Sequence, residues 1–146
     1  MYIYEFEFFE EEGLIVALPF DLEHYATQGT DMADAIEMAA DLVKSVVEDA
    51  LMNDETLPEP SYGHSPRHNG KIMVIAVEAS LDTVKAMPAS AAAVRLGISR
   101  GRVSNMLRDG VLEGFRKGRD SFVTVASVEQ RLKTTIRAGR PSKTRA

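Results

Sequence analysis

The chain has 146 residues, of which 45% are hydrophobic and 27% charged, a composition that is typical of globular proteins and excludes a disordered chain. It contains no cysteine, which excludes disulfides and thiolate metal sites, and no apolar run approaches the roughly eighteen residues of a membrane-spanning helix. The N-terminal residues form neither a basic nor an apolar leader, so we expect a cytoplasmic protein with no membrane partner.

The formal net charge of −5 hides a segregation of charge along the chain. Residues 1–63 hold sixteen Asp and Glu against one cation, Lys44, which gives −15. Residues 64–86 carry +1, and residues 87–146 carry +9 from thirteen Lys and Arg against four acids. A split of this size predicts two modules with different partners, a polyanion for the C-terminal one and something basic for the N-terminal one.

Five segments between residues 2 and 77 predict a β-β-β-α-β order. In the first, aromatic residues alternate with two glutamates, as in a half-buried strand, and the second is nearly all apolar, as in a central strand. The third is a loop or a short strand, the fourth carries an apolar stripe at helical spacing after a cap at Thr30 or Asp31, and the fifth is an apolar run that predicts a buried strand. The segments are Tyr2–Phe9, Leu14–Leu18, Ala26–Gln28, Asp31–Met52 and Ile72–Val77, within a first domain at residues 1–78.

The basic half is predicted to hold short helices separated by glycine. Residues 79–86 would form a linker helix, and Ser90–Leu96 would form a small-residue helix that ends at Gly97. Ser99 is placed to cap a second helix, Arg100–Arg108. Two short helices joined by a tight glycine turn are typical of a helix-turn-helix.

The second of these helices and the segment after it present the residue types that bind DNA. Arginine suits guanine edges and phosphates, and asparagine suits adenine. Two short strands around Lys117-Gly118-Arg119 predict a hairpin wing, and Ser127–Ile136 predicts a third helix capped by Ser127. The alternative is that these cations are merely solvated, which their concentration on one helix, one wing and one tail disfavours. The candidate DNA-binding residues are Ser99, Arg100, Arg102, Ser104, Asn105, Arg108, Arg116, Lys117 and Arg119.

The run from Met87 to about Leu132 resembles the excisionase-type, MerR-like winged helix-turn-helix DNA-binding domains. The resemblance is carried by AAAVRLGIS, then VSNMLRDGVLEGFRKGR, then FVTVASVEQRL. It implies a recognition helix in the major groove and a wing against the backbone or minor groove of operator double-stranded DNA. We expect this small, mainly helical domain at residues 87–137 and a basic disordered tail at residues 138–146. The tail's Gly139-Arg140-Pro141 is either a weak minor-groove core or a non-specific phosphate contact.

The acids of the first domain raise the possibility of a two-metal nuclease. Such chemistry needs carboxylates that converge from strand ends onto one point, and the buried runs contain no His or Asp. Glu5 and Glu7 share a strand face, and Asp21 and Glu23 share a loop. The three histidines, His24, His64 and His68, have no ligand-like spacing, so loop or surface roles are expected. We therefore predict no catalytic residue, no metal site and no cofactor.

The loop and helix start within Tyr2–Ser61 hold an ordered set of residues: Pro19, Asp21, Leu22, Thr27, Gly29, Asp34 and Ala35, followed by the run LPEPS. By this set the segment resembles the HicB antitoxin family. The family pattern has a Pro-Asp-Leu loop and a Thr-x-Gly step into a helix that begins with acids and alanine. Two departures are the insertion of Phe20 and the presence of Glu23-His24-Tyr25 where members commonly have Pro-Gly-Cys.

This resemblance implies a degraded ribonuclease-H-like domain without nuclease activity, joined to a DNA-binding domain in an α+β protein. It implies that the first domain blocks HicA, a small basic ribonuclease, and that the chain represses its own operon as a homodimer or tetramer. A surface near −15 would attract such a basic partner. The tentative toxin-binding residues are Glu10, Glu11, Glu12, Asp21, Glu23, Asp34, Glu37 and Asp41.

Two other functions stay open at this point. One is a stand-alone transcriptional regulator with a ligand-sensing first domain, which a sizeable apolar pocket would favour. The other is an enzyme of the ribonuclease H type, whose metal-dependent cleavage would disappear when Glu5 or Asp21 is changed.

Overall fold

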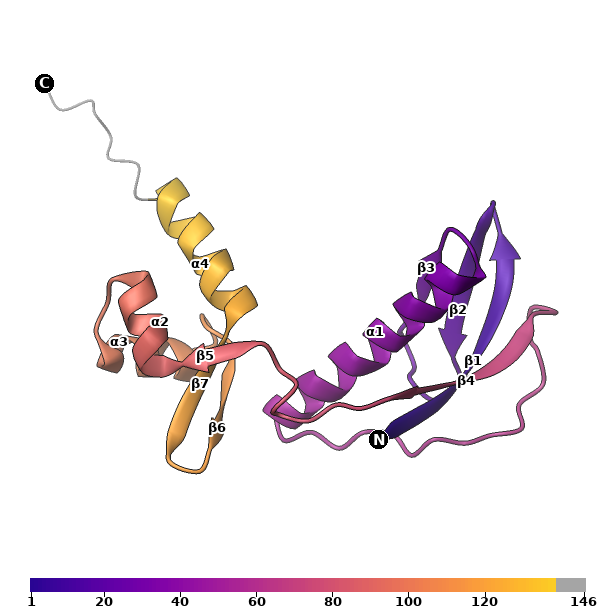
Figure 1. Ribbon diagram of the computed structural model, residues 1–146, viewed down its shortest axis with the longest axis horizontal. Helices are drawn as coiled ribbons and strands as arrows, with labels where there is room; N and C mark the ends of the chain where they lie inside the picture. The colour runs from indigo at the N-terminus through magenta and orange to yellow at the C-terminus, as the bar shows by residue number, and fades with distance from the viewer. Residues whose placement is uncertain (139–146) are drawn as a thin grey trace, which may run out of the picture. The chain divides into compact units, whose positions relative to one another are not determined.

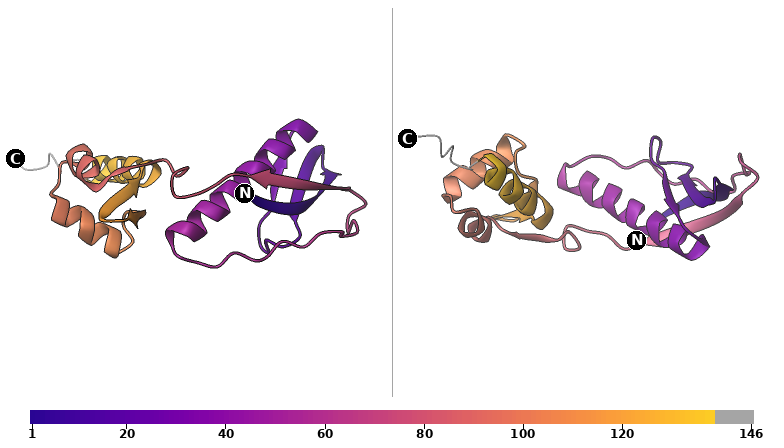
Figure 2. Two further views of the ribbon diagram at one scale, coloured as in Figure 1. Left: turned by 60° about the horizontal axis from the view of Figure 1, so that its bottom comes forward. Right: turned by 90° about the horizontal axis from the view of Figure 1, so that it is seen from above.

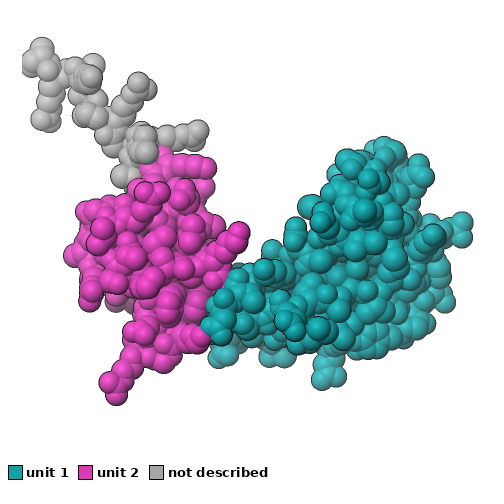
Figure 3. All heavy atoms as spheres, viewed as in Figure 1, with its two compact units in different colours: residues 1–83 teal, residues 84–146 magenta. Residues whose placement is uncertain are grey.

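The computed structural model describes residues 1–138, with side chains for residues 1–134. The chain divides into two compact units, Met1–Thr83 and Val84–Ala146 (Figure 3). By sequence the first unit carries −15, from eighteen acids and three cations, and the second carries +10, from fourteen cations and four acids. The segregation of charge therefore coincides with the division of the structure.

The first unit is a four-stranded antiparallel sheet with one helix (Figure 1). The strands lie in the order β3-β2-β1-β4, and the helix α1 comes between β3 and β4 along the chain. The predicted β-β-β-α-β order is therefore confirmed. The elements are β1 (Tyr2–Glu11), β2 (Leu14–Pro19), β3 (Thr27–Gly29), α1 (Met32–Met52) and β4 (Lys71–Val77).

Helix α1 packs along one face of this sheet (Figure 2). The carboxylate of Asp31 caps the helix by accepting the N–H of Asp34 at 2.8 Å. Small side chains on α1 meet large aromatic ones on β1, which lets the helix lie close to the sheet. The buried residues of this interface include Ala35, Ala39, Val43 and Val47 on α1 and Tyr4, Phe6 and Phe8 on β1.

Strand β4 lies at the edge of the sheet, which corrects the prediction of a buried strand. It pairs with β1 alone, and no strand flanks its other side in the described chain. Ile75 is buried toward α1, whereas its neighbour Val74 is 52% exposed on the opposite face. The apolar run was misleading because an edge strand and a central strand can share the same composition.

Residues 79–86 form no helix, so the predicted linker helix is wrong. The hydroxyl of Thr83 accepts the N–H of Ser80 at 3.0 Å, and the N–H of Thr83 donates to the carbonyl of Ser80 at 3.1 Å. The N–H of Asp82 donates to the hydroxyl of Ser80 at 3.1 Å. Hydroxyl groups that bond nearby backbone groups favour a turn over a helix. The segment then continues into a strand, β5 (Ala86–Pro88), that the sequence did not predict.

The described part of the second unit has three helices and a small antiparallel sheet of order β5-β7-β6 (Figure 1). The other elements are α2 (Ala89–Leu96), α3 (Arg100–Arg108), β6 (Gly114–Lys117), β7 (Asp120–Thr124) and α4 (Val125–Ala138). Helices and strands share one core, so this unit has its own apolar interior. The core consists of Ala92, Ala93, Val103, Met106, Leu112, Val123 and Val128.

Helix α4 begins two residues before the predicted Ser127, and its cap differs from the prediction. The hydroxyl of Thr124 accepts the N–H of Ser127 at 3.2 Å, so Thr124 caps the helix. The predicted disordered tail beyond Ala138, including Gly139-Arg140-Pro141, lies outside the described residues. Within the described part of the chain, no helix combines the length and the apolar character that crossing a membrane requires.

Candidate functional site

A tight turn joins α2 to α3 in the second unit. Gly97 adopts a left-handed conformation with φ 66° and ψ 34°, which ends α2. The N–H of Ile98 donates to the carbonyl of Ala93 at 3.0 Å. Ser99 accepts the N–H of Arg102 at 3.1 Å, so the predicted cap of α3 is confirmed. The hydroxyl of Ser99 is therefore occupied in starting the helix.

Helix α3 buries Val103 and Met106 and leaves the predicted DNA-contacting side chains exposed. The guanidinium of Arg108 donates to Oδ1 of Asn105 at 3.0 Å, and its Nε lies 3.7 Å from Asp109. Recognition of adenine by asparagine needs that same oxygen as an acceptor. An amide oxygen has two lone pairs, so Asn105 can still accept a hydrogen bond from adenine beside Arg108. The exposed residues on this side are Arg100, Arg102, Ser104, Asn105 and Arg108.

A hollow of about 380 Å³ lies between α3 and the hairpin of β6 and β7. Ser104 and Arg108 line it from α3, and Arg116 lines it from β6. Leu107 and Phe115 add apolar surface. The structure thus brings three predicted DNA-binding residues, from the helix and from the wing, around one concavity.

The other wing residues lie at the tip of the β6–β7 hairpin. Lys117 and Asp120 are paired in the register, so Gly118 and Arg119 form a two-residue turn. Gly118 has φ 63°, and two-residue hairpin turns favour glycine for this reason. Arg116, Lys117 and Arg119 are all exposed, which places the three predicted wing cations at or beside the tip.

The eight acids predicted to contact a toxin do not form one patch on the first unit. Because β3 pairs Gly29 with Ile15, α1 begins at the end of the sheet where the β1–β2 turn lies. Asp34 uses its carboxylate locally by accepting the N–H and the hydroxyl of Thr30. Glu10, Glu11 and Glu12 surround the β1–β2 turn, Asp21 and Glu23 follow the opposite end of β2, and Asp34, Glu37 and Asp41 lie on the first half of α1.

Glu5 and Glu7 are buried beneath the loop between α1 and β4, although the strand pattern assigned them to a polar face. Glu7 is 1% exposed and accepts the N–H groups of Arg67, His68 and Gly70 at 2.8–2.9 Å. Burial raises the pKa of the Glu7 carboxyl, but the three backbone donors outweigh burial and hold the pKa below 4.5. Among the residues with described side chains, no three His, Cys, Asp or Glu are arranged to hold a metal ion.

A chain of hydrogen bonds joins Glu5 to Asp21. Nδ1 of His64 lies 2.8 Å from Oε1 of Glu5, and Nε2 of His64 lies 3.0 Å from the hydroxyl of Ser61. The backbone N–H of His64 has the largest influence on Glu5 and lowers its pKa against the opposing effect of burial. A serine nucleophile needs its hydroxyl proton directed to histidine, but Ser61 donates to Asp21 at 2.7 Å. This series of hydrogen bonds therefore fastens the loop to β1, and the hydroxyl of Ser61 is not activated as a nucleophile.

Ring contacts fasten the same loop from outside. His64 stacks on Phe20 with ring centroids 4.1 Å apart, and His68 stacks on Phe9 at 4.3 Å. The guanidinium of Arg67 lies 5.2 Å from the Phe20 ring. The predicted loop roles of His64 and His68 are therefore confirmed, and His24 lies in the loop after β2.

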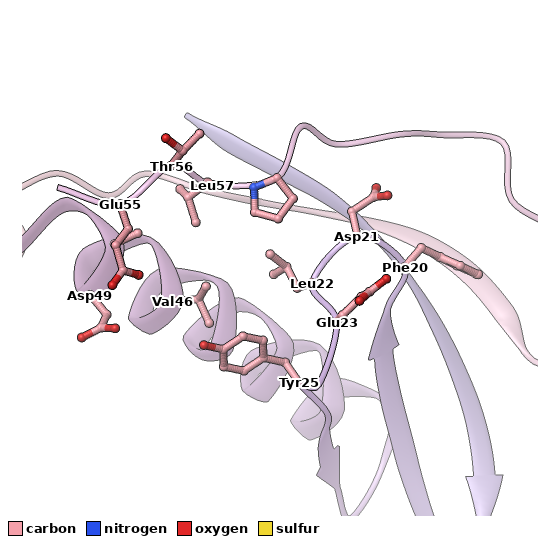
Figure 4. Close-up of a pocket in the computed structure, with 12 residues that line it drawn as sticks. Phe20, Asp21, Leu22, Glu23, Tyr25, Val46, Asp49, Glu55, Thr56 and Leu57 are labelled. Atoms are coloured by element: carbon pink, nitrogen blue, oxygen red, sulfur yellow. The ribbon is translucent and has the colours of Figure 1, made fainter. Parts of the chain in front are cut away.

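A pocket of about 480 Å³ opens beside the C-terminal half of α1 (Figure 4). Two loops complete it, one after β2 and one after α1. Leu22, Val46 and Leu57 supply its apolar floor. Four carboxylates line it as well: Asp21, Glu23, Asp49 and Glu55.

Sequence reasoning missed Asp49 and Glu55 as site residues. The acids that it singled out on α1 lie in the first half of that helix, whereas these two lie in and after its last turn. A signal was present, because the last turn of α1 contains no basic residue to complement the helix dipole. Asp49 and Glu55 lie near Asp21 and Glu23 because of the way α1 crosses the sheet. No local sequence pattern predicts that crossing.

No family model matches the chain, and no curated protein matches it. Among solved structures, the chain is similar to the crystal structure of the antitoxin HicB of Burkholderia pseudomallei, with a TM-score of 0.47 and 14% sequence identity. The match covers 53% of this chain and spans 64% of that chain.

Proposed function

We propose that this chain is a type II antitoxin with two binding activities. Its first unit binds and neutralises a small basic ribonuclease of the HicA type. Its second unit is a winged helix-turn-helix that binds promoter DNA and represses the chain's own operon. The chain acts in the cytoplasm as a homodimer or tetramer, and it carries out no catalysis. We assign toxin binding to residues 1–78 and DNA binding to residues 87–137.

The observation that carries this proposal is the opposite charge of two separately folded units, −15 and +10. A strongly acidic surface attracts a basic ribonuclease and can take the place of RNA phosphates. A basic unit attracts duplex DNA by releasing counterions. The β-β-β-α-β order of the first unit agrees with the degraded ribonuclease-H-like domain that the resemblance to HicB implies.

The geometry of the second unit supports the DNA-binding half of the proposal. Helix α3 is short, capped and exposed along the side that carries its arginines. Arg116 of the hairpin lies with Ser104 and Arg108 around one hollow, so helix and wing can contact adjacent stretches of DNA. Two copies of the chain would supply two such units for two half-sites.

A second candidate function is a stand-alone regulator whose first unit senses a small ligand. The pocket beside α1 favours it, because about 480 Å³ is within the range of ligand sites. Such a ligand would have to be cationic, since four carboxylates line the pocket. A change in DNA affinity on addition of a small cationic metabolite, without any protein partner, would favour this candidate.

Co-expression with the product of the neighbouring reading frame tests the antitoxin function. We expect a companion of fewer than about a hundred residues that is basic and arrests growth alone, and we expect this chain to restore growth and to copurify with it. Growth arrest that persists despite equal expression of this chain would refute the proposal. A gel shift with DNA from upstream of the chain's own gene tests repression separately.

A further inference from the structure

The pocket beside α1 combines an apolar floor with a partly exposed aromatic ring. Leu22 is 2% exposed and projects between α1 and the loop after α1 (Figure 4). Val46 and Leu57 continue the floor on either side of it. Tyr25 is 45% exposed at the edge of the pocket, so part of its ring is accessible to an occupant. An occupant with an apolar stem would find contact surface here.

The four carboxylates approach the pocket in two pairs, as Figure 4 shows. Asp49 and Glu55 come from the end of α1 and the loop after it, and Asp21 and Glu23 come from the loop after β2. Leu22 lies between the pairs. None of the described lining residues is Lys or Arg.

These charges have no cationic partner within the described chain. The ion pairs of His64 with Glu5, Arg95 with Glu129 and Arg108 with Asp109 lie outside the pocket, and none of the four pocket acids pairs with a described cation. The C-terminal end of α1, with its negative dipole, adds to the same potential because its last turn holds no basic residue. The chain therefore leaves a negative potential over an apolar floor without neutralising it.

We propose that this pocket receives an arginine side chain from the basic protein partner. The methylene stem would pack on the half-buried Val46 and Leu57, and the guanidinium would lie against the Tyr25 ring and between the two acid pairs. Arginine fits better than lysine because its planar, weakly hydrated group stacks on a ring and binds carboxylates through two N–H bonds. The inference rests on the proposed function and identifies the part of the toxin that the first unit binds.

Hydrogen bonds at the rim orient two of the pocket acids. Ser61 donates both its backbone N–H and its hydroxyl to the two carboxylate oxygens of Asp21, at 2.6 and 2.7 Å. Asn53 donates to the carboxylate of Asp49 at 3.3 Å. One acid of each pair is thus held in place, and the other is exposed and can adjust to a ligand. Preorganised acceptors lower the cost of binding.

The first experiment uses a probe that does not depend on the toxin. The full chain, labelled with ¹⁵N and ¹³C, is titrated with N-acetyl-arginine methylamide and, in parallel, with its neutral citrulline analogue. We expect the arginine probe to shift the signals of Leu22, Tyr25 and Val46 with millimolar affinity, and the citrulline analogue to shift them at least tenfold less. Equal shifts with both probes, or no shift at these residues, would overturn the proposal.

The second experiment compares single Glu→Gln changes of equal charge. Glu55→Gln lies in the pocket, and Glu78→Gln is an exposed control after β4 and outside the pocket. We expect Glu55→Gln to weaken binding of the copurifying toxin about tenfold and to weaken the arginine probe as well, whereas Glu78→Gln changes toxin affinity less than about twofold. Spectra of both variants check that the fold is unchanged.

The two experiments separate failure of this inference from failure of the proposed function. A toxin that binds Glu55→Gln as tightly as it binds the unaltered chain overturns the pocket assignment and leaves the antitoxin function standing. The arginine probe could also bind the pocket while Glu55→Gln leaves the affinity for the toxin unchanged. That combination would mean that the pocket binds a free cationic ligand, and it would also overturn the inference. A chain that binds no toxin refutes the proposed function, and this inference fails with it.

Discussion

The buried carboxylate of Glu7 accepts the backbone N–H of His68 at 2.8 Å, across 61 residues of sequence. Arg67 and Gly70 donate to the same carboxylate, so one side chain holds the turn before β4 against the sheet. Glu7→Gln keeps the size but turns one acceptor oxygen into a donor that faces an N–H. We expect a loss of about 1–3 kcal/mol in the free energy of unfolding.

Chemical denaturation followed by circular dichroism measures this loss. Glu11→Gln is the matched control, because Glu11 lies on the same strand and is exposed. The control is expected to change stability by less than about 0.5 kcal/mol. Equal stability of the two variants would contradict the role given to Glu7.

The pH dependence of stability follows from the same buried acids. Glu5 and Glu7 both have a folded-state pKa below 4.5, so unfolded chains take up protons first as the pH falls. The stability that these groups contribute is complete above about pH 4.5 and is lost as the pH falls through the folded pKa. Unfolding at a series of pH values should show a decline below about pH 4.5 that is shallower in Glu7→Gln. An equally steep decline in that variant would show that other groups are responsible.

The order of elements in the first unit could be predicted from sequence because its longer elements carry a recognisable pattern. Alternation predicted β1, a continuous apolar run predicted β2, and helical spacing predicted α1. Thr30 and Asp31 were the two candidate caps of α1, and Asp31 is the one that the structure shows. The burial of Glu5 and Glu7 beneath the loop between α1 and β4 could not be predicted. It depends on backbone N–H groups from a loop some 60 residues away, and that loop has no periodic pattern.

Gly29 ends the Thr-x-Gly step before α1, and the structure leaves no room for a side chain at this position. A Cβ atom at this position would lie 2.2 Å from the backbone N of Ala35, because β3 approaches the first turn of α1 closely. Gly29→Ala should therefore destabilise the first unit by about 1–3 kcal/mol or more. Gly101→Ala is the control, since Gly101 lies in the exposed part of α3 with ordinary spacing, and that change should stabilise the second unit slightly. Thermal unfolding should show a lower melting temperature for Gly29→Ala and a slightly higher one for Gly101→Ala.

Substitutions in helix α3 and substitutions at the hairpin tip should change DNA binding in different ways. Arg102→Ala and Asn105→Ala remove exposed α3 groups that can contact base edges, so each should cost about 1–3 kcal/mol on the operator and relax sequence preference. Lys117→Ala, at the hairpin tip, should weaken operator and random DNA alike and reduce the salt slope by about 1. Fluorescence anisotropy with both DNAs at several salt concentrations measures these effects. Equal affinity of the unaltered chain for both DNAs would refute sequence recognition.

The paired side chains of Asn105 and Arg108 add a further expectation for the same assay. Because Arg108 donates to only one of the two lone pairs of Asn105 Oδ1 in the free chain, Arg108→Ala leaves the amide able to bind adenine and removes a candidate phosphate contact. The variant should lose affinity for random DNA but keep its preference at the position that Asn105 contacts. Loss of that preference would mean that Arg108 itself contacts the base.

The candidate sites were predictable to different degrees. The residue types of α3 and of the hairpin tip predict a candidate DNA-contacting surface by themselves, since the cations are exposed wherever the helix and the turn form. The pocket was not predictable, because Asp49 and Asp21 belong to elements that meet only after α1 has packed across the sheet. Local patterns give helices and turns, whereas the convergence of distant loops is a property of tertiary packing.

Inhibition of RNA cleavage is the most direct test of the antitoxin function. The purified toxin cleaves a labelled RNA, and this chain is added in increasing amounts. We predict that cleavage falls linearly to background near one chain per toxin, because the acidic unit occupies the surface that RNA phosphates would contact. Undiminished cleavage in the presence of excess chain would contradict the account.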